Sequence, residues 1–348
     1  MAKSGNPATK GTTPITELKS VDDVIERYQA PGPHATVVMR RALPGERGED
    51  RHIRWHATQT DLRHHQADDA MIRCLDDARE ELDRRGVHVL LTANAQSAAF
   101  CWLADHEVPS GIRVASHPDL LPALEELSDR APAIGAIVDH VGADTFELGH
   151  LDLVETGSVK GDHVSTHRHT GGDQAGFQRR ANQVYERNAD LIAKELTKNA
   201  ERAGATLIVL TGDDREVASV EQHLDQHRFA VHTVQAGARH EPDSPARLHL
   251  AAREAALEER TRHRTEAVAR LARELGQHDL AVAGQATTQT AISEGRVATL
   301  FLDASQIDEI GEANLLAKGA LELGADVVVA PDIPAPDGVA GLLRYAYT

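Results

Sequence analysis

The sequence predicts a multidomain α/β protein on three observations. Its 348 residues exceed a typical domain of roughly 100–200 residues. Short apolar runs alternate with longer charged segments in which apolar residues recur at spacings of three and four. Clusters of Pro, Gly and charged residues interrupt this alternation near residues 45–50, 109–118, 128–132 and 237–245. We therefore expect three α/β units separated by these breaks.

In the N-terminal part, the sequence pattern predicts a tail followed by an α/β domain. Residues 1–17 are expected to form a disordered tail, because most of this segment is polar and rich in Thr, Gly, Ser and Pro. The tail lacks the apolar core of a secretory signal, which favours a cytoplasmic protein. Residues 18–131 are expected to form the domain. Its apolar runs and its acid–base segment predict strands at 35–39, 52–56, 87–92 and 98–103 and a helix at 68–85.

In the central part, the pattern of residues 132–243 predicts a β-hairpin, a polar loop and a long helix. The hairpin consists of residues 134–139 and 145–154. The helix runs from about 175 to 202, because apolar side chains recur along one stripe, formed by Phe177, Ala181, Tyr185, Ala189, Ile192, Leu196 and Ala200. A second, outward stripe holds Arg180, Arg187, Lys194 and Lys198. A strand, a helix and a strand follow at 205–210, 215–226 and 229–234.

Residues 244–348 predict a charged linker helix and a C-terminal α/β domain. The helix covers 245–275, where charged residues dominate and apolar positions are scattered. The remaining pattern alternates strands and helices, with strands at 280–283, 297–302 and 327–330, helices at 287–294 and 312–322, and a final segment at 338–347.

Composition limits the classes of function. Asp and Glu number 54 against 37 Lys and Arg, a formal charge of −17, so the protein is not expected to coat nucleic acid with its whole surface. Mean hydropathy is −0.38 and no apolar run approaches the roughly 20 residues of a membrane span, which predicts a soluble chain. Cys74 and Cys101 have no metal-binding spacing and are expected to be buried thiols.

The stretch from Gly157 to Arg187 carries the strongest functional signal. Gly171 and Gly172 allow the backbone to approach a ligand closely. The stretch also has five basic side chains against three acidic ones, although the whole chain is acidic. The basic residues are Lys160, Arg168, Arg179, Arg180 and Arg187, and the acidic ones are Asp162, Asp173 and Glu186. This local balance predicts an exposed loop suited to phosphate groups.

These residues resemble the central domain of archaeo-eukaryotic class I release factors and of Pelota. The shared order is a hairpin, a loop rich in His and Arg, two glycines, and Phe177-Gln178-Arg179-Arg180 at the start of a long helix. Residues 290–302 (TAISEGRVATLFL) and 338–345 (GVAGLLRY) resemble motifs of the family's C-terminal domain. The resemblance covers about 134–347 and places the chain in the bacterial branch, which includes Balon-like ribosome hibernation factors. It implies a three-domain release-factor/Pelota-like architecture.

The resemblance also implies which residues act. In release factors the two glycines precede a glutamine that helps to place water on the ester bond of peptidyl-tRNA, whereas Asp173 occupies that position here. A carboxylate cannot donate a hydrogen bond and is repelled by RNA phosphates, so peptide release is not expected. Gln174, one residue later, serves only in the alternative that the chain is a peptidyl-tRNA hydrolase or a rescue enzyme. The stop-codon loop Asn-Ile-Lys-Ser is absent.

The implied function is that of a hibernation factor in the aminoacyl site of the 70S ribosome, with elongation factor Tu as a further partner. No cofactor, metal or membrane is expected. The residues expected to contact ribosomal RNA are Arg168, His169, Gly171, Gly172, Asp173, Gln174, Arg179, Arg180 and Arg187.

Other interpretations remain open at this point. Two metal sites are conceivable, one at His163, His167 and His169 and another at Asp213 and Asp214. We favour an RNA-facing loop for the histidines, and for either aspartate a cap on the following helix. No Walker, G-x-S-x-G or G-x-G-x-x-G motif occurs. An RNA nuclease of release-factor type, or an α/β protein that has acquired another partner, is the remaining alternative.

Overall fold

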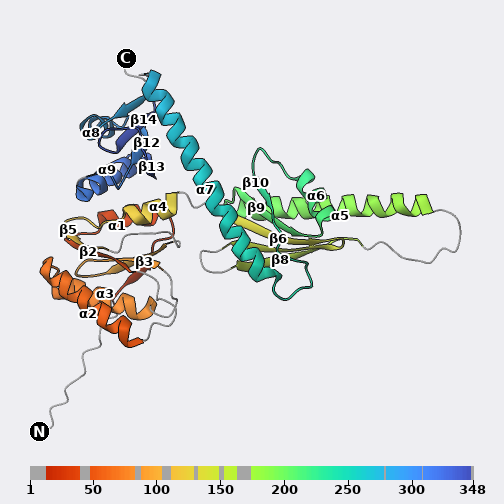
Figure 1. Ribbon diagram of the computed structural model, residues 1–348, viewed down its shortest axis with the longest axis horizontal. Coiled ribbons are helices and arrows are strands. Elements are labelled where there is room, and N and C mark those ends of the chain that lie inside the picture. The colour runs from red at the N-terminus through yellow and green to blue at the C-terminus, as the bar shows by residue number, and fades with distance from the viewer. Residues whose placement is uncertain are drawn as a thin grey trace, which may run out of the picture. The chain divides into compact units, whose positions relative to one another are not determined.

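The computed structural model describes residues 13–39, 48–82, 88–103, 111–128, 132–148, 153–162, 174–277, 280–307 and 309–345. Contacts divide the chain into two compact units (Figure 1). The terminal unit combines Met1–Asp129 with Arg264–Thr348, and the central unit is Arg130–His263. Each unit is an assembly of helices on β-sheet, so the predicted α/β fold class is confirmed.

The N-terminal half of the terminal unit is a five-stranded sheet. The strand order is β1 (Ile15–Glu17), β4 (Ala98–Leu103), β3 (His88–Ala93), β2 (His34–Met39) and β5 (Ile112–Ala115). Strand β1 is parallel to β4 and the other pairs are antiparallel. Its helices are α1 (Val21–Gln29), α2 (Gly48–His64), α3 (Asp69–Leu82) and α4 (Leu121–Ser128). Helix α1 begins where Ser20 and Asp23 form a capping box.

Two expectations for this half are wrong. The tail was expected to extend to residue 17, but Ile15–Glu17 pairs with Ala98–Phe100 because this apolar edge offers a free ladder of backbone groups. The segment 52–56 was expected to be a strand and lies inside α2. Its apolar–polar alternation is overridden by packing, since Trp55 Nε1 and Gln59 Nε2 both donate hydrogen bonds to Asp76 on α3.

The C-terminal half is a four-stranded sheet with the order β11 (Ala281–Ala283), β14 (Val339–Leu343), β12 (Val297–Leu302) and β13 (Asp326–Val329). Helices α8 (Gln285–Ser293) and α9 (Ile310–Glu322) pack on it. One hydrophobic cluster contains residues of both halves, among them Val24, Tyr28, Leu120 and Leu124 from the first and Ala313, Ala317, Val327 and Leu343 from the second. The two halves of the terminal unit therefore share a core.

The central unit is a mixed five-stranded sheet. Its order is β10 (Ala230–Thr233), β9 (Leu207–Gly212), β6 (Ala133–Asp139), β7 (Gly142–Leu148) and β8 (Leu153–Lys160). The pairs β10–β9 and β9–β6 are parallel, whereas β6–β7 and β7–β8 are antiparallel. Helices α5 (Gln174–Ala203) and α6 (Asp214–His223) pack on a core with Ile134, Ala136 and Leu210.

Helix α7 (Ser244–Gln277) contributes to two cores. Its first half places Leu248, Ala252 and Ala255 in a cluster with residues of the central sheet. Its second half places Leu271 against Phe301 and Leu342 of the C-terminal sheet. The described helix thus exceeds the predicted linker helix by one residue at its start and two at its end.

Two details of the central unit differ from the sequence prediction. The hairpin turn lies at residues 140–141, and the second predicted strand, 145–154, comprises most of β7 and the start of β8. Residues 155–160, which the sequence suggested were loop, belong to β8 and place Lys160 at its end. The long helix and the strand–helix–strand unit are confirmed. The division into domains at 18–131, 132–243 and 244–348 remains a proposal.

Candidate functional site

The sequence-predicted site falls on the connection between β8 and α5. Arg168, His169, Gly171, Gly172 and Asp173 lie outside the described residues, as do His163 and His167 of the alternative metal site. Gln174 is the first residue of α5, so its backbone is already helical. Arg179, Arg180 and Arg187 follow on the same helix, and the side chains of Arg179 and Arg187 are exposed.

Helix α5 forms because its apolar residues recur on one face, and the structure buries that face. Ala181, Ala189, Ile192, Leu196 and Ala200 are all at most 5% exposed. The opposite face carries Lys194 and Lys198, each paired with a neighbouring carboxylate: Lys194 Nζ lies 2.7 Å from Asp190 and Lys198 Nζ lies 3.4 Å from Glu195. These pairs make the C-terminal half of α5 a solvated surface of nearly balanced charge.

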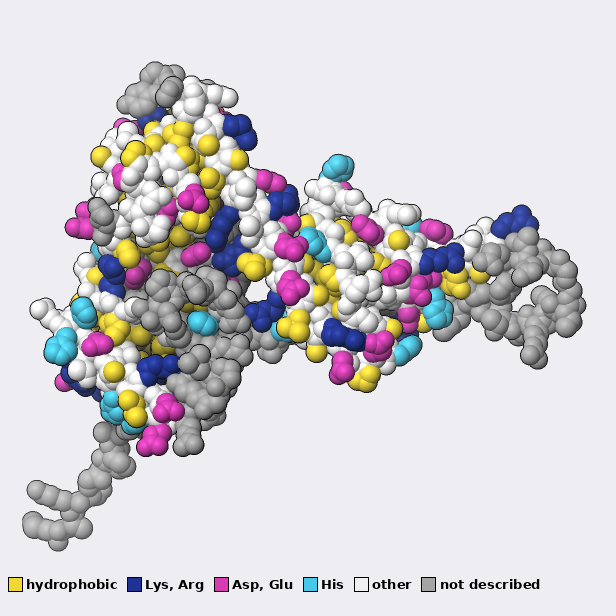
Figure 2. All heavy atoms as spheres, viewed as in Figure 1, with side chains coloured by type: hydrophobic (Ala, Val, Ile, Leu, Met, Phe, Trp, Pro, Cys, Tyr) yellow, Lys and Arg dark blue, Asp and Glu magenta, His cyan; other side chains and the backbone are white. Residues whose placement is uncertain are grey.

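The N-terminal half of α5 is more basic. The exposed guanidinium of Arg187 donates from Nε to the carbonyl of Gln183 on its own helix at 3.1 Å. Figure 2 shows basic side chains at the end of α5 where the connection to β8 begins, whereas Lys and Arg alternate with Asp and Glu over the rest of the visible face of the central unit. Positive charge is therefore local to this end.

Asn188 fixes the place where the connection leaves the sheet. Its amide nitrogen donates to the carbonyls of His140 and Asp162, both at 3.0 Å, and its Oδ1 accepts from the Asp162 amide at 2.8 Å. It is 4% exposed. One side chain thus joins α5, the β6–β7 turn and the end of β8. Sequence reasoning missed this role of Asn188. The signal available in the sequence was a polar residue on the otherwise apolar side of α5.

Gly161 is required for that contact. A Cβ atom built on Gly161 would lie 2.3 Å from Cγ of Asn188, far inside van der Waals contact. The Gly161 amide also donates to the carbonyl of Val141 at 2.7 Å, which holds the chain next to the β6–β7 turn. Any larger residue would displace Asn188 and change the direction in which the chain leaves β8.

Arg239 stabilises the hairpin that leads into β8. Arg239 donates from Nε and Nη2 to the two oxygens of Asp144 at 2.9 and 2.7 Å, and from Nη2 to Ser158 Oγ at 2.8 Å. Its Nη1 lies 3.4 Å from Asp139. Hydrogen bonding to Arg239 lowers the pKa of the Asp144 carboxyl and the same bonds raise the pKa of Arg239. This clamp connects β6, β7 and β8 to the segment after β10.

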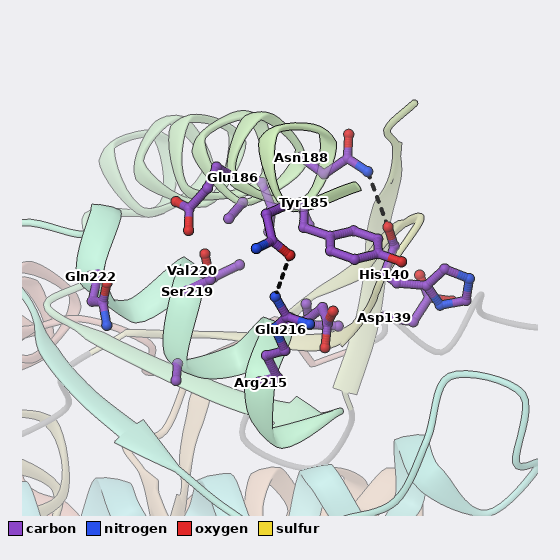
Figure 3. Close-up of a pocket in the computed structure, with 15 residues that line it drawn as sticks. Asp139, His140, Tyr185, Glu186, Asn188, Arg215, Glu216, Ser219, Val220 and Gln222 are labelled. Carbon is purple, nitrogen blue, oxygen red and sulfur yellow. Dashed lines mark hydrogen bonds between the residues drawn. The ribbon is translucent and has the colours of Figure 1, made fainter. Parts of the chain in front are cut away.

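A pocket of about 280 Å³ with a mixed polar and apolar lining lies between α5 and α6, next to the carboxyl end of β6 (Figure 3). Arg215 enters it from α6, donates to Asn182 Oδ1 at 2.8 Å and lies 5.5 Å from the centre of the Tyr185 ring. Glu216 faces the same space, and burial, followed by the nearby Asp213, raises the pKa of its carboxyl. Asn188 lines the pocket as well, so the pocket adjoins the root of the β8–α5 connection.

The alternatives raised by the sequence can be compared with this geometry. Asp213 caps α6, because its carboxylate accepts a hydrogen bond from the Arg215 amide at 3.2 Å, as the sequence favoured. Within the part of the chain that the structure describes, no three His, Cys, Asp or Glu side chains are arranged to hold a metal ion. Cys74 and Cys101 are buried free thiols, which confirms that expectation. None of the described helices is both long and apolar enough to cross a membrane.

Residues 132–277 match the family described as bacterial archaeo-eukaryotic release factor family 2. That match covers the whole central sheet, α5, α6 and α7. The central segment is thus similar to a bacterial release-factor-like family. This confirms the resemblance seen in the glycine-containing segment, which lies inside the matched range.

Two curated relatives extend the likeness over most of the chain, and three solved structures are reported with them. An uncharacterized protein from each of two strains of Mycobacterium tuberculosis is 25% identical over 350 residues, covering 86% of this chain and 90% of the relative. Archaeal Pelota, from a model of the ribosome-bound protein with ABCE1, is 12% identical with a TM-score of 0.48 and 96% of each chain covered. Dom34 of S. cerevisiae, a translation termination-like factor, is 10% identical with a TM-score of 0.42, covering 96% of this chain and 93% of that chain. The archaeal translation termination factor aRF1 is 16% identical with a TM-score of 0.26, covering 93% of this chain and 96% of that chain.

Proposed function

We propose that this chain is a cytoplasmic translation factor that binds the 70S ribosome in its aminoacyl site and acts in hibernation under stress, without releasing peptide. The observation that carries the proposal is the release-factor family match over residues 132–277, the segment that contains Gly171, Gly172 and the basic end of α5. Archaeal Pelota, one of its structural neighbours, is described as ribosome-bound. Elongation factor Tu is proposed as a second partner.

The chemistry of the glycine segment supports a role in binding rather than hydrolysis. Asp173 follows the two glycines where release factors carry glutamine. A carboxylate only accepts hydrogen bonds when ionised, so it cannot hold both a water molecule and the ester carbonyl as an amide does. Repulsion from rRNA phosphates adds to this penalty. The chain would then occupy the aminoacyl site without completing a hydrolytic centre.

The structure also weighs against the second candidate, a peptidyl-tRNA hydrolase acting through Gln174. Gln174 is the only glutamine adjacent to the Gly-Gly-Asp triplet, yet it is the first residue of α5. Moving it into the catalytic position would require it to leave the first turn of this 30-residue helix.

The first test is co-sedimentation of the full chain with vacant 70S ribosomes, with and without elongation factor Tu, together with a peptide-release assay on loaded ribosomes. We expect binding that weakens steeply with salt and no release above background. Absence of binding at low salt would overturn both ribosomal candidates. Binding with release would establish the hydrolase, and Gln174→Ala would then be the first variant to examine.

A matched pair of charge reversals tests whether the basic end of α5 makes the contact. We expect Arg179→Glu with Arg187→Glu to weaken ribosome binding at least tenfold, because two phosphate contacts are lost and replaced by repulsion. Lys194→Glu with Lys198→Glu changes the same charge on the same helix, where each lysine already faces an acidic neighbour. Equal weakening by both pairs would indicate general charge attraction and contradict the assigned surface.

Asp173→Gln separates binding from hydrolysis. If the segment reaches the ester, the amide should create measurable peptide release while ribosome affinity stays the same or rises. Release that stays at background with this variant, despite full binding, would place the segment away from the catalytic centre.

A further inference from the structure

Two histidines on α2 bring their ring nitrogens together at the surface of the terminal unit. His52 and His56 are four residues apart on this helix, so their side chains lie on the same side of it. Nε2 of one ring lies 3.0 Å from Nε2 of the other. Both residues are exposed, so solvent and small ions reach the pair.

The distance between these two nitrogens matches that of two neighbouring ligands on one metal ion. Imidazole nitrogens bind Zn²⁺ at about 2.0–2.1 Å, so two of them at an angle of about 90–110° are about 2.9–3.4 Å apart. The observed 3.0 Å falls within this range. The ring planes are at 82° to each other, so the two rings are not stacked face to face. The pair therefore has the nitrogen separation of a chelate before any ion is bound.

The electron pairs of the two rings also favour an ion between them. A neutral imidazole has one N–H group and one acceptor nitrogen. Two acceptor nitrogens at 3.0 Å repel each other unless a proton or a metal ion lies between them. A proton would make an N–H···N hydrogen bond, which contributes little at an exposed position because water competes for both rings. Such a bond does not prevent a metal ion from replacing the proton.

The helix that carries the pair is fixed by contacts on its inner side. Trp55, which lies between the two histidines in sequence, is 4% exposed. One turn later, Gln59 Nε2 donates to the two carboxylate oxygens of Asp76 on α3 at 2.8 and 3.0 Å. Because the backbone of α2 is already held, binding has to order only the two histidine side chains, which keeps its entropic cost low.

The start of α2 adds negative charge near the pair. Glu49 and Asp50 lie in the first turn of the helix, where they offset the positive end of its dipole. Glu49 is exposed and stands three residues before His52, a spacing that puts it on the same side. Among the described residues no group of three His, Cys, Asp or Glu side chains is arranged around a metal position. The protein thus offers two ligands here, and water would supply the others.

We propose that His52 and His56 form a two-ligand site for a divalent transition-metal ion, with Nε2 of each ring bound to the ion. Imidazole nitrogen favours Cu²⁺, Ni²⁺ and Zn²⁺, whereas Mg²⁺ and Ca²⁺ prefer oxygen ligands. Cu²⁺ should bind most tightly of the three. The bound ion would join two successive turns of α2. Because both ligands are on one helix of the terminal unit, binding does not depend on the ribosome.

Copper binding to the full chain tests the site. His163, His167 and His169 are the alternative metal site, so the parent chain for all measurements carries His163→Asn, His167→Asn and His169→Asn. With one Cu²⁺ per chain, electron paramagnetic resonance should show two imidazole nitrogens bound to the ion. Adding His52→Asn and His56→Asn should weaken Cu²⁺ binding about tenfold or more, because loss of the supporting partners of a metal ligand alone has an effect of that size.

The matched control is the addition of His64→Asn and His65→Asn to the same parent. These two histidines are also exposed, at the end of α2, but neighbours in sequence do not face each other. Their replacement should leave both the affinity and the number of bound nitrogens unchanged. Equal weakening by the two pairs would indicate adventitious binding and overturn the proposal, as would fewer than two imidazole nitrogens in the parent.

Urea unfolding with and without Zn²⁺ distinguishes loss of the site from damage to the fold. Without metal, His52→Asn with His56→Asn should unfold at the same urea concentration as the parent, because both side chains are exposed. Saturating Zn²⁺ should raise the midpoint of the parent and not that of the variant, since an ion that binds the folded chain stabilises it. Fluorescence of Trp55 and Trp102 reports the transition. A parent midpoint that Zn²⁺ leaves unchanged, or raises equally in both chains, would contradict the site.

Discussion

Two buried asparagines, one inside each unit, form similar sets of hydrogen bonds with different consequences. Asn314 is 2% exposed and its Oδ1 accepts from the Tyr28 hydroxyl at 2.7 Å and from the Leu120 amide at 2.9 Å. Its Nδ2 donates to Asp119 and to the carbonyl of Ile310, both at 2.9 Å. Asn188 likewise satisfies three hydrogen bonds at the root of the β8–α5 connection.

The difference lies in what surrounds their partners. Tyr28 and Leu120 are buried at 2% and 0% exposure, so water cannot replace Asn314. The partners of Asn188 are the exposed residues His140 and Asp162, where water can take over. The buried hydrogen bonds of Asn314 in the core should therefore control stability. Those of Asn188, at the edge of a sheet, should control where the β8–α5 connection begins.

Asn314→Leu should have the largest effect on stability. The change leaves the Tyr28 hydroxyl and the Leu120 amide without an acceptor in the shared core, at a cost of about 4 kcal/mol in the free energy of unfolding of the terminal unit. Tryptophan fluorescence during urea unfolding measures it, because Trp55 and Trp102 are the only tryptophans and both lie in this unit. Tyr28→Phe removes one hydrogen bond and should cost about 1 kcal/mol. Equal losses of unfolding free energy in the two variants would show that Asn314 contributes no more than its single bond from Tyr28.

Arg239→Leu should destabilise the central unit by about 3 kcal/mol, since it leaves Asp144 and Asp139 half-buried without their cation. Hydrogen exchange of β7 and β8 amides reports this unit directly. Arg247→Leu is the control, because its pair with Glu241 is about half exposed and should contribute below about 1 kcal/mol. A larger effect of Arg247→Leu would contradict the stabilising role assigned to Arg239.

Acid should destabilise the terminal unit first through His34. Burial, reinforced by the positive charge of Arg27, lowers the pKa of His34 to about 4, and His34 is 1% exposed. The unfolded chain has a histidine pKa near 6.5 and binds the proton first, so stability falls as the pH drops from about 6.5 towards 4. The loss between pH 7 and pH 5 should be about 2 kcal/mol.

His34→Leu removes this titrating group and should flatten the dependence on pH over that range. Tryptophan fluorescence at both pH values measures it. The central unit serves as the internal comparison, because the lowered pKa of Asp144 implies a stability contribution that is lost only at lower pH, as the carboxyl becomes protonated. An unchanged slope in His34→Leu would assign the acid sensitivity to other groups.

Asn188→Ala should have the smallest effect on stability and a clear effect on function. We expect a loss of about 1 kcal/mol, because water replaces the lost hydrogen bonds, together with severalfold weaker co-sedimentation with ribosomes. Asn199→Ala is the matched control: Asn199 is also 4% exposed on α5 but contacts Thr145 in the sheet at 3.5 Å. Similar losses of ribosome binding by both variants would show that the root of the connection is unimportant.

The local features of the chain were largely predictable. The periodicity of α5 gave its bounds to within one residue and its buried face. Either Asp213 or Asp214 was expected to cap the following helix, and the structure shows that Asp213 does so. The segment 52–56 was misassigned because alternation over five residues occurs inside helices too. Only the contact with Asp76 on α3 decided in favour of a helix.

The candidate site was predictable in part. Sequence reasoning placed Arg187 on an outward stripe of the long helix and named Arg179 as an expected RNA contact, and both side chains are exposed. It missed Asn188 and Gly161, since their roles depend on a contact between residues 27 apart. It also missed the pocket, whose lining comes from β6, α5 and α6.

By itself, the sequence determined the order of the helices and strands in the central and C-terminal parts, a cap at Asp213 or Asp214, the local basic charge and the substitution of Asp173 for glutamine, because each follows from neighbouring residues. Only the tertiary structure decided that the N-terminal and C-terminal sheets of the terminal unit share a core, and that Asn314 and Asn188 each join several segments by buried hydrogen bonds. It also decided that the carboxylates of Asp139, Glu186 and Glu216 line one pocket with Arg215. These features join residues far apart in the chain, and burial of their common surface selects among pairings that no local pattern distinguishes.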